Sequence, residues 1–88
     1  MIIHGNTITE EQERAALARM TSSFLFSDIE KALIAAGVPE MQRVGVSNKH
    51  IAGRAADRLI QRERKEGRIK LGPKAQWHPV PPAEVGKQ

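Results

Sequence analysis

The chain has 88 residues, of which 40% are hydrophobic and 3% aromatic, and it contains no cysteine. A chain of this length builds one small core, and without cysteine it forms neither disulfides nor thiolate zinc sites, so we expect a single cytoplasmic domain. No apolar run approaches the roughly 20 residues of a membrane helix, and the first residues lack the basic and apolar regions of a secretory signal.

The charge is distributed unequally along the chain. The 14 Lys and Arg against 10 Asp and Glu give a net charge of +4. Residues 1–46 carry four basic and six acidic side chains, whereas residues 47–88 carry ten basic and four acidic ones. Concentrated Lys and Arg release counterions from phosphates, so a nucleic acid is the first partner to consider. The alternative is a basic face that is only solvated.

A capping box predicts where the first helix begins. Thr9 is followed by Gln12 at the third helical position, with acidic residues between them, so we expect a helix over residues 10–20. The apolar segment 24–26 that follows is expected to enter the core as a loop or a brief strand.

A second capping box, Ser27 with Glu30, predicts a helix over residues 28–36. Apolar residues recur at helical spacing within it, and Gly37 supplies a left-handed stop. We interpret residues 37–46 as a loop that leads to the next helix.

The third predicted helix is the longest and runs from its cap residue Ser47 to the glycine stop at Gly67. Gly53 weakens its interior by about 1 kcal/mol relative to Ala. At 100° per residue the helix separates into an apolar and a polar face. The apolar face consists of Ile51, Ala52, Ala55, Ala56, Leu59 and Ile60, and the polar face of His50, Arg54, Asp57, Arg58, Gln61 and Lys65.

After the third helix the pattern changes to that of a β-hairpin. Residues 68–71 alternate polar and apolar, residues 72–74 are a Gly-Pro-Lys turn, and residues 75–80 return as a second strand. Pairing should end by Pro79, because proline cannot donate to the ladder.

The hairpin is expected to complete the core. Ile69 and Leu71 should face the helices, and Trp77 should anchor the returning strand. We therefore expect one domain over residues 1–78, followed by a flexible tail rich in Pro and Gly over residues 79–88.

Three helices followed by a basic hairpin, with the most basic helix third, resemble the winged helix-turn-helix family of DNA-binding domains. The most specific local feature is the junction RLIQRERKEGRI at residues 58–69, which is similar to the family's recognition-helix end, glycine stop and first wing strand. The resemblance implies a mainly α (α+β) fold whose third helix enters the major groove of double-stranded DNA while the wing contacts the backbone. It implies DNA-binding roles for Ser47, Lys49, His50, Arg54, Arg58, Gln61, Arg62, Lys65, Arg68, Lys70 and Lys74.

Two features depart from the family's pattern. Glu63 stands one turn before the glycine, where the family usually has an apolar residue, so the end of the third helix is either less buried or pairs with a basic side chain. The connection over residues 37–46 also exceeds the three or four residues of a tight helix-turn-helix, which leaves the tilt of the third helix open.

Other site chemistries find less support in the sequence. Arg54 and Arg58 lie one turn apart, where they either reach guanine edges and phosphates or form a solvated face with local ion pairs. The histidines, His4, His50 and His78, match no zinc spacing, so no metal site is expected. No serine has a histidine and an acid arranged nearby, and no glycine-rich loop opens a helix, so catalysis is not expected.

These observations predict a small DNA-binding protein, a transcriptional or replication regulator of bacterial or phage type that acts without a cofactor. We expect it to bind as a homodimer, with the dimer contact supplied by the first helix or by residues 1–4, unless those residues are a frayed terminus. The rival function is a winged-helix module that docks on an acidic protein partner. A third is a nonspecific architectural or single-strand binder that stacks Trp77 on bases.

Overall fold

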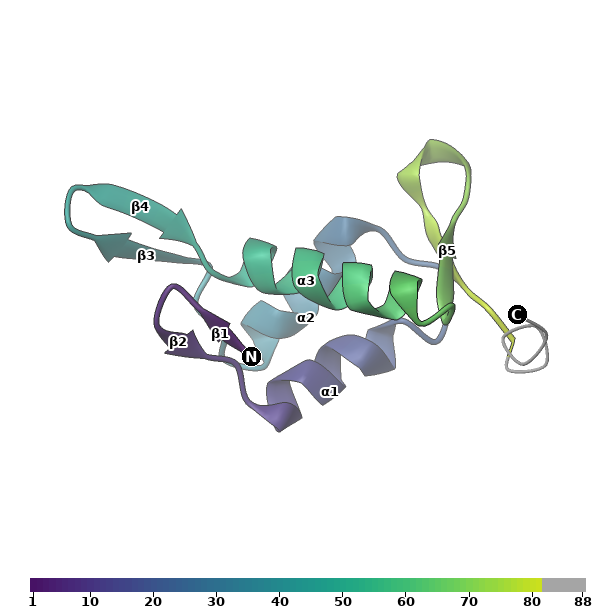
Figure 1. Cartoon of the computed structure of the whole chain (residues 1–88), viewed down its shortest axis with the longest axis horizontal. Coiled ribbons are helices and arrows are strands. Elements are labelled where there is room, and N and C mark those ends of the chain that lie inside the picture. Colours follow the sequence, from purple (N-terminus) through teal and green to yellow (C-terminus); the bar gives the residue numbers. More distant parts are fainter. Residues whose placement is uncertain (82–88) are drawn as a thin grey trace.

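Residues 1–81, the part of the chain that the computed structural model describes, form three α-helices and three antiparallel two-stranded hairpins (Figure 1). This confirms the mainly α, α+β fold class, and the C-terminal hairpin is consistent with the predicted wing. Residues 82–88 of the predicted tail lie outside the described residues. The elements are β1 (Ile2–Ile3), β2 (Asn6–Thr7), α1 (Glu10–Arg19), α2 (Phe26–Ala35), β3 (Met41–Val44), β4 (Ser47–His50), α3 (Ala52–Lys65), β5 (Ile69–Leu71), a 3-10 turn (Pro73–Ala75) and β6 (Trp77–Pro79).

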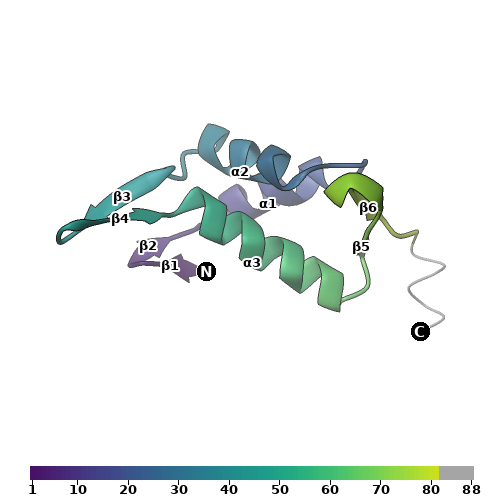
Figure 2. The ribbon, with the colours of Figure 1, turned by 90° about the horizontal axis from the view of Figure 1, so that it is seen from above.

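The core lies between the helices, with α3 packed on α2 and α2 on α1 (Figures 1 and 2). Gly53 lies where α3 approaches α2 closely. A Cβ at this position would lie only 2.8 Å from Oε2 of Glu30 on α2, so a larger residue would force Glu30 to move. Within residues 1–81, no helix is both long enough and apolar enough to cross a bilayer. The predicted apolar face of the third helix is confirmed by the burial of Ile51, Ala52, Ala55, Ala56, Leu59 and Ile60.

Helix α1 begins as its capping box predicts. The Thr9 hydroxyl accepts a hydrogen bond from the Gln12 backbone N–H at 3.1 Å, and the Gln12 side chain accepts one from the Thr9 N–H at 2.9 Å. Two N–H groups that the first helical turn leaves without partners are thereby satisfied, and the helix ends at Arg19, close to the expected end.

Helix α2 begins two residues earlier than predicted, and its cap is not Ser27. The N-cap is Leu25, whose N–H donates to Oδ2 of Asp28 at 2.8 Å. A carboxylate is a stronger acceptor than a hydroxyl, and the positive end of a helix favours it further. The end of the helix is confirmed, since Gly37 has a φ of 101°.

The segment predicted as a loop, together with the predicted first turn of the third helix, forms a β-hairpin instead. Strands β3 and β4 pair in antiparallel register, and Gly45, with a φ of 64°, takes the first position of the two-residue turn. Ser47, Lys49 and His50 therefore lie on β4 and not on the helix, which begins only at Ala52.

Contacts distant in sequence explain this difference. The Ile51 and Ala52 N–H groups, at the start of α3, donate to the backbone oxygens of Glu40 and Pro39 at 3.0 and 3.1 Å. These bonds close the base of the hairpin and satisfy helix-terminal donors that a cap residue would otherwise serve. The other end of α3 agrees with the sequence, because Gly67 has a φ of 76°.

The C-terminal hairpin joins the core through Trp77. Trp77 is buried and exchanges two backbone hydrogen bonds with Phe24, of 2.8 and 3.0 Å, so the loop between α1 and α2 contributes one β-bridge to this hairpin. Ile69 is buried as predicted. The prediction for Leu71 is wrong, because this residue lies next to the turn, where the hairpin leaves the helices, and is 57% exposed.

The N-terminal residues are not frayed. Strands β1 and β2 pair as a short hairpin, in which Ile3 is buried, and the N–H of Ile8 donates to the Met1 backbone oxygen at 2.7 Å. These contacts place the first residues against the body of the protein.

The different positions of Thr9 and Ser47 lead to a prediction about stability. Thr9→Ala removes a helix cap and should lower the free energy of unfolding by about 1 kcal/mol. Ser47→Ala changes an exposed strand residue and should alter it by less than about 0.5 kcal/mol. Urea denaturation followed by circular dichroism measures both. A cost at Ser47 equal to that at Thr9 would show that Ser47 caps a helix after all.

Candidate nucleic-acid interface

The face of α3 that points away from the core carries a stripe of polar residues. Arg54, Arg58, Gln61 and Lys65 lie within about 60° of one another around the helix axis and extend over about 16 Å along it. The three cations are exposed and Gln61 is half-buried. We call these four residues the α3 stripe.

The cations of the α3 stripe are not neutralised within the part of the chain that the structure describes. None of Arg54, Arg58 and Lys65 forms an ion pair with an acidic side chain of residues 1–81. Asp57 lies at the edge of the stripe but makes no such pair with either arginine. From the sequence, one of two expectations for Arg54 and Arg58 is a solvated face with local ion pairs. The described residues form no such pairs on this face.

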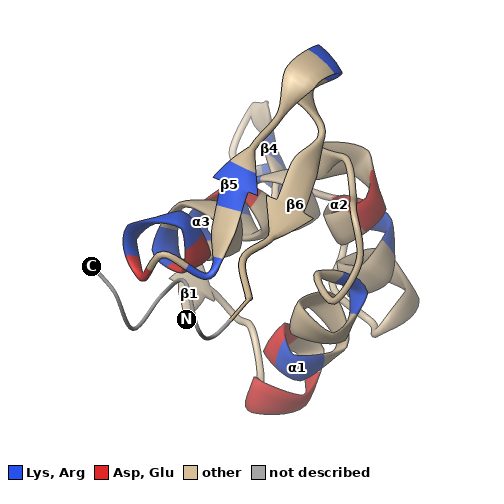
Figure 3. Cartoon of the chain, turned by 90° about the vertical axis from the view of Figure 1, so that its right-hand side faces the viewer, with Lys and Arg blue, Asp and Glu red and all other residues tan. Residues whose placement is uncertain are grey.

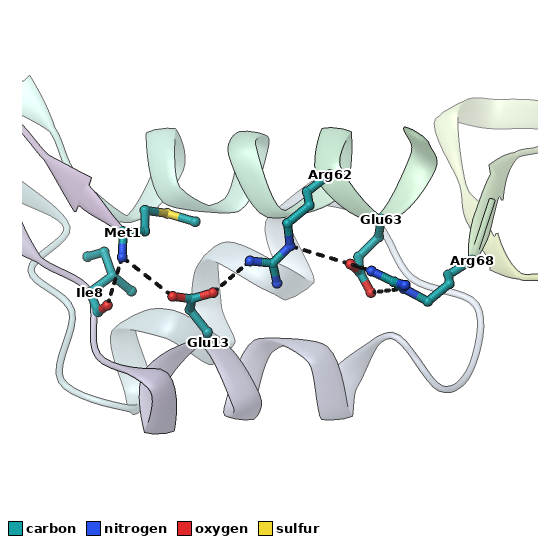
Figure 4. Close-up of polar contacts among 6 residues, drawn as sticks. All are labelled: Met1, Ile8, Glu13, Arg62, Glu63 and Arg68. Carbon is teal, nitrogen blue, oxygen red and sulfur yellow. Dashed lines mark hydrogen bonds and ion pairs between the residues drawn. The ribbon is translucent and has the colours of Figure 1, made fainter. Parts of the chain in front are cut away.

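Two of the predicted DNA contacts, Arg62 and Arg68, are instead engaged in an ion-pair chain (Figure 4). Arg68 donates two hydrogen bonds to Glu63, of 2.9 and 2.7 Å, and Arg62 lies 3.5 Å from the same carboxylate. Arg62 also donates to Glu13 on α1 at 2.8 Å. The chain links α3 to α1 on one side and to the start of the wing on the other.

Glu63 is the buried centre of this chain, with 7% of its surface exposed. Of the two expectations for this position, pairing with a basic side chain is confirmed and a less buried helix end is wrong. The hydrogen bonds from Arg68 hold the pKa of the Glu63 carboxyl below its ordinary value, although burial opposes this shift. The same bonds raise the pKa of Arg68, so both groups are charged at neutral pH.

The remaining predicted residues lie on hairpins beyond the two ends of α3 (Figures 1 and 3). Lys70 and Lys74 are exposed on the β5–β6 hairpin, which we call the wing, near the last turn of the helix. Ser47, Lys49 and His50 lie on the β3–β4 hairpin, which we call the arm, near the first turn. The structure thus divides the predicted site among the α3 stripe, the ion-pair chain, the wing and the arm.

Sequence reasoning missed two exposed cations. Arg43 lies on β3, within the segment predicted as a loop, and Arg64 lies on α3 beside the stripe. The positive charge of Arg43 was visible in the sequence, but its placement on a hairpin beside the third helix was not.

Comparison with known proteins adds no relative to this description, because no protein-family model, no curated protein and no solved structure matches the chain. Among the described residues, no three His, Asp or Glu side chains gather in a way that could hold a metal ion.

The Glu63–Arg68 pair leads to a prediction about pH. A carboxyl whose pKa is lower in the folded state than in the unfolded chain stabilises the fold above its unfolded pKa, near 4.5, and loses that effect as the pH falls through the folded value. Glu63→Gln should lower the free energy of unfolding by about 1–3 kcal/mol at about pH 7, and the difference from the unmodified protein should shrink near pH 3.

Urea denaturation at both pH values measures this difference. The exposed Glu66, 4.0 Å from Arg68, provides the control, and Glu66→Gln should have little effect. A difference for Glu63→Gln that stays constant with pH would contradict a stabilising ionised pair.

Proposed function

We propose that the protein binds double-stranded DNA, with the exposed face of α3 in the major groove and the wing on the adjacent backbone. The observation that carries this proposal is the α3 stripe, whose three cations form no ion pair within residues 1–81. A regulatory role in transcription or replication, and binding as a homodimer to paired half-sites, belong to the same proposal.

The chemistry of the stripe suits a duplex. Arg54 and Arg58 present planar guanidinium groups that can bind guanine edges or phosphates with two hydrogen bonds. The amide of Gln61 lies between cations and offers the donor and acceptor pair that recognises adenine. The stripe thus presents groups that can read base edges and groups that can bind phosphate on one face of α3.

The wing supplies cations beyond the last turn of α3. Lys70 lies on β5 and is exposed. Lys74 occupies the turn with a φ of 58°, at the end of the hairpin that projects from the body (Figure 3). Both are placed to contact phosphate, whereas Arg62 and Arg68 support the interface by holding α3 and the wing in position.

Fluorescence anisotropy with a duplex of about 30 base pairs at about 50 and 200 mM salt tests the proposal. Arg54→Ala/Arg58→Ala should weaken binding at least about tenfold. The slope of log affinity against log salt should become shallower by about 0.9 for each of the two arginines that contacts a phosphate.

The matched control is Arg14→Ala/Lys31→Ala, which removes two exposed cations from α1 and α2 and should leave binding close to that of the unmodified protein. If the unmodified protein fails to bind DNA at low salt, the proposal is wrong. The basic face of α3 would then be assigned to an acidic protein partner, and capture of such a partner that is lost in Arg54→Ala/Arg58→Ala would support that assignment.

A further inference from the structure

We propose that the arm is a second DNA-contacting element, which binds the phosphate backbone beside the first turn of α3. This inference rests on the function proposed above and extends it, because it places α3 between two basic hairpins. The additional contacts come from Arg43 and Asn48, together with His50, whose position on the arm differs from the helical position expected from the sequence.

The arm belongs to a segment of the chain that carries cations and no acidic side chain. Residues 41–56, which form the arm and the first turn of α3, contain no Asp or Glu. They contain Arg43, Lys49 and Arg54, and His50 adds a further polar ring. A continuous segment with cations and without acids attracts a polyanion along its whole length.

The arm adds little to the core. Arg43, Ser47, Asn48 and His50 are exposed, Lys49 is half-buried, and Val46 at the turn is 95% exposed. An isolated two-stranded hairpin is marginally stable in water, so its formation requires support from elsewhere. A hairpin that buries so few of its side chains is better explained by an external partner than by the stability of the fold.

The body of the protein supplies that support at the base of the arm. Two backbone hydrogen bonds, from Ile51 to Glu40 and from Ala52 to Pro39, join the hairpin to the start of α3. The side-chain amide of Asn6 on β2 donates to the side chain of Gln42 on β3. The arm is thereby held in a defined direction relative to α3.

The register of the strands determines which side chains face the proposed DNA. Directly paired residues share a face of the hairpin, so Arg43 lies beside Asn48 on one face, and Gln42 lies beside Lys49 on the other. Gln42 contacts β2, so Arg43 and Asn48 point away from the N-terminal hairpin. In Figure 1 the arm extends beyond the first turn of α3, and the wing rises from beyond its last turn.

The side chains on this face are available for a phosphate. The Nε–H of Arg43 donates to the Gly45 backbone oxygen at 3.2 Å, which orients the guanidinium, and within residues 1–81 its terminal nitrogens make no hydrogen bond. His50 lies close to the first turn of α3, since its Cβ is 4.0 Å from the position that a Cβ on Gly53 would take. The exposed face of the arm therefore ends near the first turn of the helix.

A duplex fits this arrangement better than a peptide does. A helix in the major groove has a phosphate backbone on each side, and basic hairpins beyond both of its ends are placed over these backbones. Guanidinium, amide and ammonium groups are common phosphate contacts, and they fix the orientation of a protein on DNA without reading its sequence. We therefore assign the arm to positioning and affinity, and base recognition to α3.

The test compares the arm variant Arg43→Ala with the control Arg14→Ala in the same anisotropy titration. Both variants lose one exposed positive charge, and circular dichroism checks that both are folded. The arm variant should make the salt slope shallower by about 0.9, as expected for one lost phosphate contact, whereas the control should not. Arg43→Glu, a single exposed change, should weaken binding further than Arg43→Ala.

Hydroxyl-radical footprinting locates the contacts. The arm variant should lose protection at one edge of the footprint, and Lys70→Ala/Lys74→Ala should lose it at the opposite edge. Loss at the same edge would overturn the arrangement of α3 between two hairpins.

The outcomes separate this inference from the proposed function. If Arg54→Ala/Arg58→Ala weakens binding while Arg43→Ala keeps the salt slope of the unmodified protein, the arm inference is wrong and the proposed function stands. If the unmodified protein does not bind DNA, both fall.

Discussion

The ion pair between Glu63 and Arg68 is the constraint on which the arrangement of α3 and the wing depends. Glu63 is buried at the end of α3, where an unpaired carboxylate would be strongly destabilising. Arg68 follows directly after the glycine that ends the helix, and its two hydrogen bonds compensate for the lost hydration. The pair therefore links the last turn of α3 to the first strand of the wing.

The same pair belongs to an uneven distribution of charge, in which some cations of α3 and the wing are paired with acids and others are not. Glu63 and Glu13 engage Arg62 and Arg68 between the helices, whereas the cations of the α3 stripe face outward without an acidic partner in residues 1–81. Attractive pairs thus connect α3 to α1 and to the wing, and an excess of positive charge remains on the exposed face of α3. The DNA-binding function that we propose uses this excess.

Several elements could be predicted because their signals are local. The capping box at Thr9 involves residues three positions apart, the stops at Gly37 and Gly67 depend on one residue each, and the buried face of α3 follows from helical periodicity. Four of the predicted site residues, Arg54, Arg58, Gln61 and Lys65, lie together for the same reason. The arm was missed because its strands are largely exposed, so their sequence does not show the alternation of apolar and polar residues that identifies a half-buried strand.

The sequence by itself determined the three helices, the C-terminal hairpin and the polar face of α3, because contacts between residues three or four positions apart specify helices, and turn residues with an alternating pattern specify hairpins. Only the tertiary structure decided where α3 begins, since the backbone of Pro39 and Glu40 takes the place of a cap at Ser47. It also decided that Arg62 and Arg68 are held in ion pairs. Arg62 meets Glu13, 49 positions away in the chain, and no local pattern reports contacts over that distance.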